Sequence, residues 1–181
     1  MGIQLINGFH SILVALTKHP GIWWFLAPVF VLWIVMEIYF GEYKKEKLGW
    51  NSILANGISL SWINIASFRV LFLENASSVT DFYLRLLILV ILFLYGIFVI
   101  YIAFTHKLSH NIGSWLAGPT TVYFLSTMSV LWGQGHLEIN QWILIDFIIL
   151  YIIIYFIFYL IKKKLGTLGE VEAIEKGQSP I

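Results

Sequence analysis

The residues that could do chemistry in this chain are a few ionisable side chains inside long apolar segments. Glu37 follows Trp33 by one helical turn near the end of one such segment, and Asp146 lies near the start of another. A charge at the centre of a membrane helix costs roughly 2.5–3.5 kcal/mol on insertion scales, so such residues often have a function. Glu37 is therefore a candidate proton-coupling carboxylate. The alternative is a carboxylate that reaches the cytoplasmic lipid headgroups or pairs with Lys44.

A second polar set lies near the opposite ends of the apolar segments. Arg69, Arg85 and Asp146 share a similar expected depth on three different segments. We expect Asp146 to pair with Arg69 or Arg85, because an ion pair offsets part of the cost of placing each charge in lipid. Such a pair would order the bundle. The alternatives are an anion or substrate site at an outer vestibule, or arginine contacts with lipid headgroups.

Residues 52–73 carry a polar stripe. At about 100° per residue, Ser52, Asn56, Ser59 and Ser67 fall within one narrow stripe of a helix, with Asn64 at its edge. This stripe should face protein or water rather than lipid. It could line a permeation path, or its members could join helices through hydrogen bonds worth about 0.6–2 kcal/mol each.

Proline interrupts the segment 112–133. Gly118 and Pro119 are followed by Thr120 and Thr121. Proline removes a backbone hydrogen bond, and we expect the threonine hydroxyls to satisfy the freed carbonyls around a mild kink. Broken helices also mark binding sites in many transporters.

The elements that must position these residues are membrane helices. The chain is 59% hydrophobic and 12% charged, about half the charged fraction of a typical soluble domain. A span needs about 20 mostly apolar residues. We therefore expect an all-α, polytopic membrane helix bundle with five transmembrane helices over residues 22–161. The expected spans are 22–40, 52–73, 82–105, 112–133 and 141–161.

Two flanking segments differ from the expected spans. Residues 1–18 predict a short interfacial amphipathic helix, and residues 162–181 predict a frayed cytoplasmic tail with at most one short surface helix. The apolar side of the N-terminal helix is expected to contain Ile3, Ile6, Phe9, Leu13 and Leu16.

The distribution of lysine predicts the topology. Basic residues favour the cytoplasmic flanks of membrane helices. With five spans, most basic residues lie on the side of the C-terminus, which predicts an outer N-terminus and a cytoplasmic C-terminus, in a cell membrane. The lysines on that side are Lys44, Lys45, Lys47, Lys107, Lys162, Lys163, Lys164 and Lys176.

Composition and motifs restrict the function. The absence of cysteine excludes disulfides and thiolate chemistry. No basic domain suits nucleic acid, and no H-E-x-x-H, G-x-S-x-G, P-loop or dinucleotide-binding motif is present. His106 and His110 are too few for a metal site, so we expect no metal and no cofactor.

Three classes of function stay open. The chain could be an oligomeric transporter or channel-like protein, or a structural or accessory subunit of a membrane complex. A lipid-modifying enzyme is the third. The expected partners are the lipid bilayer and either a second copy of the chain or another membrane protein.

Overall fold

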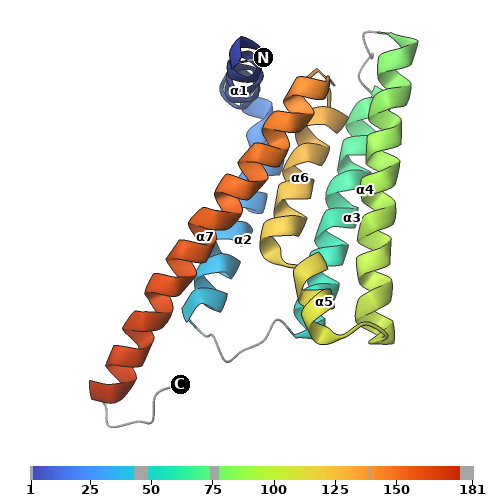
Figure 1. Ribbon diagram of the computed structural model, residues 1–181. Helices are drawn as coiled ribbons and strands as arrows, with labels where there is room; N and C mark the ends of the chain where they lie inside the picture. The colour runs from blue at the N-terminus through green and yellow to red at the C-terminus, as the bar shows by residue number, and fades with distance from the viewer. Residues whose placement is uncertain (1, 43–48, 74–77, 139, 176–181) are drawn as a thin grey trace.

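The computed structural model describes residues 2–42, 49–73, 78–138 and 140–175, and within these ranges the chain is helical without strands. Figure 1 shows the arrangement. The elements are α1 (Gly2–Lys18), the 3-10 helix η1 (Pro20–Ile22), α2 (Trp23–Glu42), α3 (Trp50–Leu73), α4 (Val79–Thr105), α5 (His110–Leu116), α6 (Pro119–Gly133) and α7 (Gln141–Glu175).

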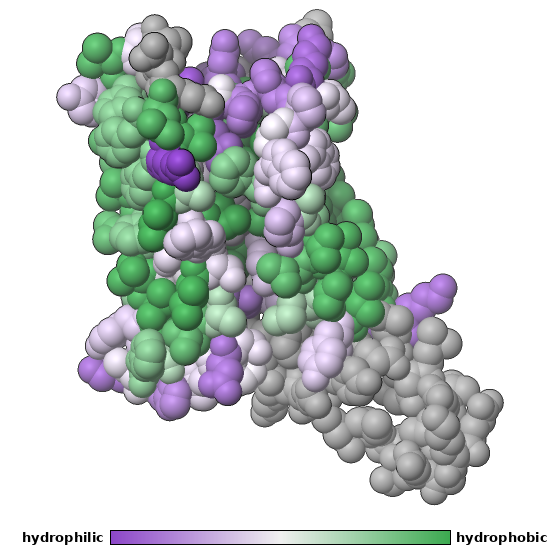
Figure 2. Space-filling view, turned by 180° about the vertical axis from the view of Figure 1, so that it is seen from behind, coloured by the Kyte–Doolittle hydropathy of each residue, from purple (hydrophilic) through white to green (hydrophobic). Residues whose placement is uncertain are grey.

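Three of these helices are long and apolar enough to cross a membrane. They are the stretch Pro20–Tyr39, α4 and the part Gln141–Lys164 of α7. Their outward side chains are mostly large and hydrophobic, among them Val31, Leu94 and Ile152. Figure 2 shows the result on one face, where green hydrophobic side chains cover much of the middle and purple hydrophilic ones gather toward both ends. This surface suits lipid rather than water.

A close pair of helices, α3 and α4, forms one side of the bundle (Figure 1). Gly57 and Gly96 permit the close approach. A methyl group on Gly96 would lie 2.5 Å from Ser61 Oγ and 3.3 Å from the Gly57 carbonyl oxygen. Small residues at such crossings let backbones meet, which is how membrane helices gain packing energy without a hydrophobic driving force.

Helix α6 lies at the centre, between the α3–α4 pair on one side and α2 on the other. Most of its residues are buried, including Tyr123, Val130 and Trp132. Helix α7 crosses α2 obliquely in Figure 1 and packs mainly against α1 and α2. The main apolar core therefore joins α2, α6 and α7, with α1 at its edge.

The N-terminal helix α1 lies across the end of the bundle and is viewed nearly end-on in Figure 1. A location in the membrane interface stays a prediction, and the packed face of the helix differs from the predicted one. Gly8, Ile12 and Ala15 are buried, whereas Ile6 and Leu13 are 68% and 61% exposed. The helix has one side that packs against the protein and a second apolar side that faces outward. The spacing of large apolar residues alone did not distinguish these two sides.

Two predicted boundaries are wrong. The segment 112–133 is not one kinked helix, because α5 ends at Leu116 and α6 begins at Pro119. The segment after residue 161 is not frayed up to residue 175, since α7 continues to Glu175. Its 35 residues span about 52 Å, more than the 30 Å of a hydrocarbon core, and its C-terminal part extends beyond the other helices in Figure 1. Residues 176–181 lie outside the described part.

Candidate functional site

The start of α6 is fixed by its sequence. Gly118 has an extended backbone at the N-cap, and Pro119 occupies the first turn. A proline is tolerated there because the first amides of a helix have no carbonyl partner within it. The break therefore leaves a helix N-terminus inside the bundle, with Thr120 in its first turn.

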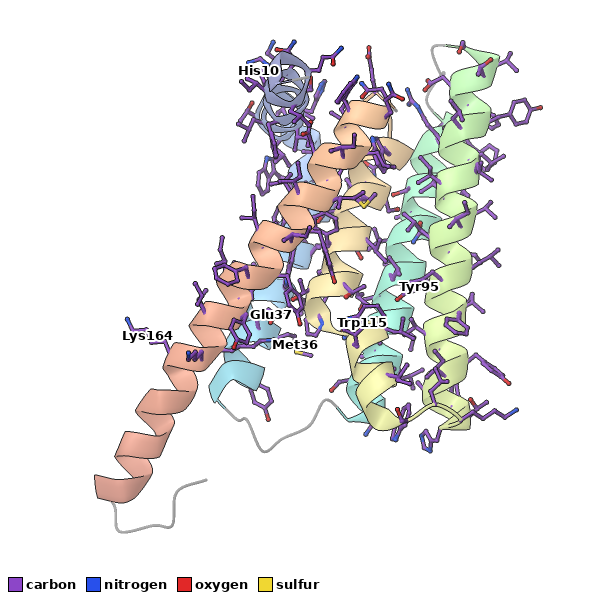
Figure 3. All side chains as sticks on the ribbon, in the orientation of Figure 1. His10, Met36, Glu37, Tyr95, Trp115 and Lys164 are labelled. Atoms are coloured by element: carbon purple, nitrogen blue, oxygen red, sulfur yellow. The ribbon has the colours of Figure 1, made fainter. Side chains whose placement is uncertain are left out.

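Glu37 of α2 lies at this N-terminus. Its side chain is fully buried. One carboxylate oxygen, Oε1, accepts a hydrogen bond from the Thr120 hydroxyl, and the other, Oε2, forms an ion pair with Nζ of Lys162 on α7. Figure 3 shows Glu37 where α2, α7 and the beginning of α6 come together. Three helices thus meet at one carboxylate.

The electrostatic surroundings favour a negative charge at Glu37. The partial positive charge of a helix N-terminus stabilises a nearby anion by about 0.3–1 kcal/mol, and by up to about 2 kcal/mol in partly buried sites. The Lys162 ammonium adds a full positive charge. The carboxylate is fully and the lysine partly removed from water, so the net stabilisation of the ion pair is smaller than its electrostatic attraction.

The surroundings of Glu37 differ on its two sides. Toward the middle of α2, the indole of Trp33 packs against three other rings, with centroid distances of 6.2 Å to Phe30, 6.5 Å to Phe124 and 5.6 Å to Phe158. On the other side, Lys162 is 36% exposed. Packed aromatic rings therefore lie on the α1 side of the carboxylate, and a partly exposed lysine lies on the other side.

Lys162 was not named as a partner of Glu37 from the sequence. Lys44 lies outside the described residues, so its pairing with Glu37 is untested. Lys162 was assigned to the cytoplasmic tail, and it reaches Glu37 because α7 continues as a helix past residue 161.

The carbonyls freed by the α5–α6 break are satisfied by side chains from neighbouring helices. Tyr95 donates to the Leu116 carbonyl at 2.9 Å, and Asn56 donates to the Ala117 carbonyl at 2.7 Å. Figure 3 labels Tyr95 on α4 near this break. Of the two threonines expected to do this, Thr121 contributes a 3.4 Å contact with the Trp115 carbonyl, whereas the Thr120 hydroxyl is used by Glu37.

The polar stripe of α3 faces α6. Ser129 Oγ donates to Asn64 Oδ1 at 3.0 Å, and Asn64 Nδ2 donates to the Leu60 carbonyl at 2.8 Å. Ser67 Oγ lies 3.4 Å from Ser129 Oγ and 3.3 Å from Gln134 Nε2. All of these groups are buried. This arrangement is typical of interhelical hydrogen bonding.

The predicted stripe differs from the observed one at its margins. Asn64, expected at the edge, is at the centre of the contact with α6, and Ser59 is only half-buried. Ser61, which was not in the predicted stripe, is buried on the neighbouring side, toward Gly96 of α4. The helix is buried on two sides, so a single stripe was too narrow a description.

The predicted ion pair of Asp146 with Arg69 or Arg85 is wrong. Arg85 binds Asp81 on its own helix, with Nη2 2.6 Å from Oδ2. Asp146 is fully buried and its two carboxylate oxygens have no hydrogen-bond partner among the described residues. The physical reason is that α7 packs against α1 and α2, away from the helices that carry the arginines.

Asp146 instead faces α1. A Cβ atom on Gly8 would overlap Asp146 Oδ2, so the carboxylate occupies the space that a side chain at this position would need. The signal for this contact is the lack of a side chain at Gly8 on an otherwise regular helix, which sequence analysis did not use.

No relative supplies a function. No protein-family model matches the chain, and no curated protein or solved structure shows detectable similarity to it.

The described residues also contain no group of three His, Cys, Asp or Glu side chains that could hold a metal ion. The side chain of His110 lies outside the described part, so the expectation for the pair of His106 and His110 is untested. The best-defined cluster of chemistry-bearing groups is therefore the carboxylate, hydroxyl and ammonium of Glu37, Thr120 and Lys162.

Proposed function

We propose that the chain is a five-span membrane protein that moves a proton or a small cation, as a transporter or channel-like protein, through a site at Glu37. The observation that carries the proposal is the ion pair of the buried Glu37 with Lys162 at the N-terminus of a broken helix. Broken helices form ion and substrate sites in many transporters, and here the α6 N-terminus favours the carboxylate that would bind the cation.

The five-span topology is supported by the packing of α3. This helix has 24 residues and lies alongside α4, which is itself apolar enough to span. Its low hydropathy comes from polar side chains such as Asn56 and Asn64, and these are hydrogen-bonded within the protein. Helices α5 and α6 together supply the fourth span. The lysine distribution then gives an outer N-terminus and a cytoplasmic C-terminus in a cell membrane.

The chemistry of the site suits a cation. A carboxylate in a low-dielectric site needs a positive partner or a proton, and Lys162 supplies the ammonium in this structure. A small cation that enters beside Lys162 would compete with the ammonium for the same oxygen. Thr120 holds the other oxygen in place. Exchange between the lysine and the transported cation is the step we propose.

The protein would work as an oligomer, because five helices are few for a pore within one chain. The large apolar side chains on the outer side of α4, including Leu87, Leu94 and Phe104, offer surface for a second copy as well as for lipid.

A flux screen in proteoliposomes tests the proposal. Purified protein is reconstituted, and uptake of protons, alkali cations and small amines is measured against protein-free vesicles. We expect cation flux above the vesicle background. A complete absence of flux for protons and all cations tested would contradict transport.

The second candidate is a structural or accessory subunit of a membrane complex. The specific observation in its favour is the α3–α6 contact, where Asn64, Ser67 and Ser129 use their polar groups on one another and on the backbone. Such a contact needs no permeant ion. Flux distinguishes the two candidates, since only the first requires it.

A further inference from the structure

A second region with a distinct chemistry lies between α2 and α3, at the end opposite to Glu37. A groove of about 360 Å³ is lined by Phe25 of α2 and by six residues of α3. These are Trp62, Ile65, Ala66, Arg69, Val70 and Leu73. All of them except Arg69 are apolar.

Arg69 is an exposed cation at the edge of this apolar groove, and the structure gives it no carboxylate partner among the described residues. Arg85 differs, because its guanidinium binds Asp81. A guanidinium forms strong, often bidentate hydrogen bonds with phosphate oxygens. A phosphate is therefore a suitable acceptor for the guanidinium donors of Arg69.

The depth of Arg69 fits this acceptor. It lies four residues before the end of α3 at Leu73, which is about 6 Å along the helix axis. Trp23 and Trp24 begin α2 at the same end and are 41% and 86% exposed. Tryptophan at helix ends is typical of the membrane–water interface. The guanidinium thus lies near the headgroup level, while Ile65 and Trp62 continue the groove toward the bilayer centre.

We propose that this groove binds one phospholipid, with its phosphodiester on Arg69 and an acyl chain along Phe25, Trp62, Ile65 and Ala66. A phospholipid is the occupant that matches both features, since a soluble anion would leave the apolar walls unused and a neutral lipid would leave the arginine unpaired. The site is independent of the proposed transport, because it lies on another part of the bundle from Glu37.

Native mass spectrometry of the detergent-purified protein tests the proposal. The probes are phosphatidylglycerol, diacylglycerol with the same acyl chains, and inorganic phosphate. We expect one phosphatidylglycerol to be retained, and diacylglycerol to be retained about tenfold less. Arg69→Gln should lower the retention of phosphatidylglycerol to that of diacylglycerol, and Arg69→Lys should restore part of it.

Two further variants test the groove and the arginine separately. Ala66→Trp fills the groove without changing Arg69, so it should also lower retention. Arg85→Gln removes an arginine at similar depth that already has a partner, so retention should stay at the wild-type value. Arg69 is exposed and Ala66 is half-buried in the wall of the groove, and we expect their variants to keep the wild-type Tm.

Three results would overturn the proposal. Equal retention of phosphatidylglycerol by the wild type and Arg69→Gln would show that Arg69 does not bind the phosphate. Unchanged retention of phosphatidylglycerol by both Ala66→Trp and the smaller Ala66→Leu would show that no acyl chain lies in the groove. Displacement of the lipid by inorganic phosphate alone would assign the site to a soluble anion.

Discussion

Glu37 of α2 and Lys162 of α7 form an ion pair in which the carboxylate is fully buried and the lysine is 36% exposed. The pair is asymmetric. Loss of the carboxylate leaves an ammonium that can turn toward water, whereas loss of the ammonium leaves a buried negative charge.

The first prediction follows from this asymmetry. Lys162→Met should lower the free energy of unfolding by about 1–3 kcal/mol, less than the full cost of breaking a buried pair because Thr120 and the α6 N-terminus still hold the carboxylate. Glu37→Gln should lower the free energy of unfolding less than Lys162→Met does. The double variant should regain most of the stability that Lys162→Met loses. Unfolding in mixed detergent measures all three. Equal losses in the two single variants would contradict an ion pair of this geometry.

The second prediction concerns the α5–α6 break. Asn56→Ala should leave the Ala117 carbonyl without its donor and cost about 1–3 kcal/mol. Asn51→Ala is the control, because Asn51 is exposed on the first turn of the same helix and should change stability by less than about 0.5 kcal/mol. Both variants are compared by thermal unfolding in detergent. Indistinguishable Tm values for the two would show that Asn56 does not support the break.

The third prediction concerns the docking of α1. Gly8→Ala should displace α1 from α7, since the new Cβ would overlap the Asp146 carboxylate. The chain has no cysteine, so Ala15→Cys on the buried side of α1 reports the docking by its rate of thiol labelling. Labelling should be faster when Gly8→Ala is added to this reporter.

Gly21→Ala serves as the matched control, because a Cβ there would have no neighbour within 4 Å. It should leave the labelling rate of Cys at position 15 unchanged. A Gly8→Ala rate equal to that of Gly21→Ala would mean that α1 does not dock through Gly8.

The fourth prediction concerns Asp146 itself. Asparagine has nearly the same volume and no charge, so Asp146→Asn should raise the free energy of unfolding by about 1 kcal/mol, given that neither carboxylate oxygen has a hydrogen-bond partner among the described residues. Chemical unfolding in detergent gives the value. A loss of stability instead would indicate a cationic partner and would revive the interhelical ion pair.

The positions of most helices could be predicted from the sequence, because apolar segments and local caps carry their own signals. Asn140 precedes the last helix, where asparagine is a typical N-cap, and its Oδ1 accepts from the amides of Trp142 at 3.0 Å and Ile143 at 2.9 Å. The polar side of α3 was also predicted to face protein or water, and Asn56, Asn64 and Ser67 are buried against α6 and the α5–α6 break.

The partners of the buried charges could not be predicted in the same way. A helix is a local property of the chain, whereas the partner of Glu37 depends on which helices are neighbours and on how far α7 extends. Asp146 shows the same difference. Its depth in the membrane suggested Arg69 or Arg85 as its ion-pair partner, whereas the packing of α7 places its carboxylate against Gly8. The α5–α6 break likewise depends on donors from Tyr95 and Asn56 on other helices.

The central claim is that cations cross the membrane through the site at Glu37. The most direct measurement is the initial rate of cation uptake into proteoliposomes that contain equal amounts of folded wild type, Glu37→Gln or Asp146→Asn. We predict that Glu37→Gln reduces uptake to the rate of protein-free vesicles while Asp146→Asn keeps the wild-type rate. Uptake by Glu37→Gln at the wild-type rate would contradict the claim.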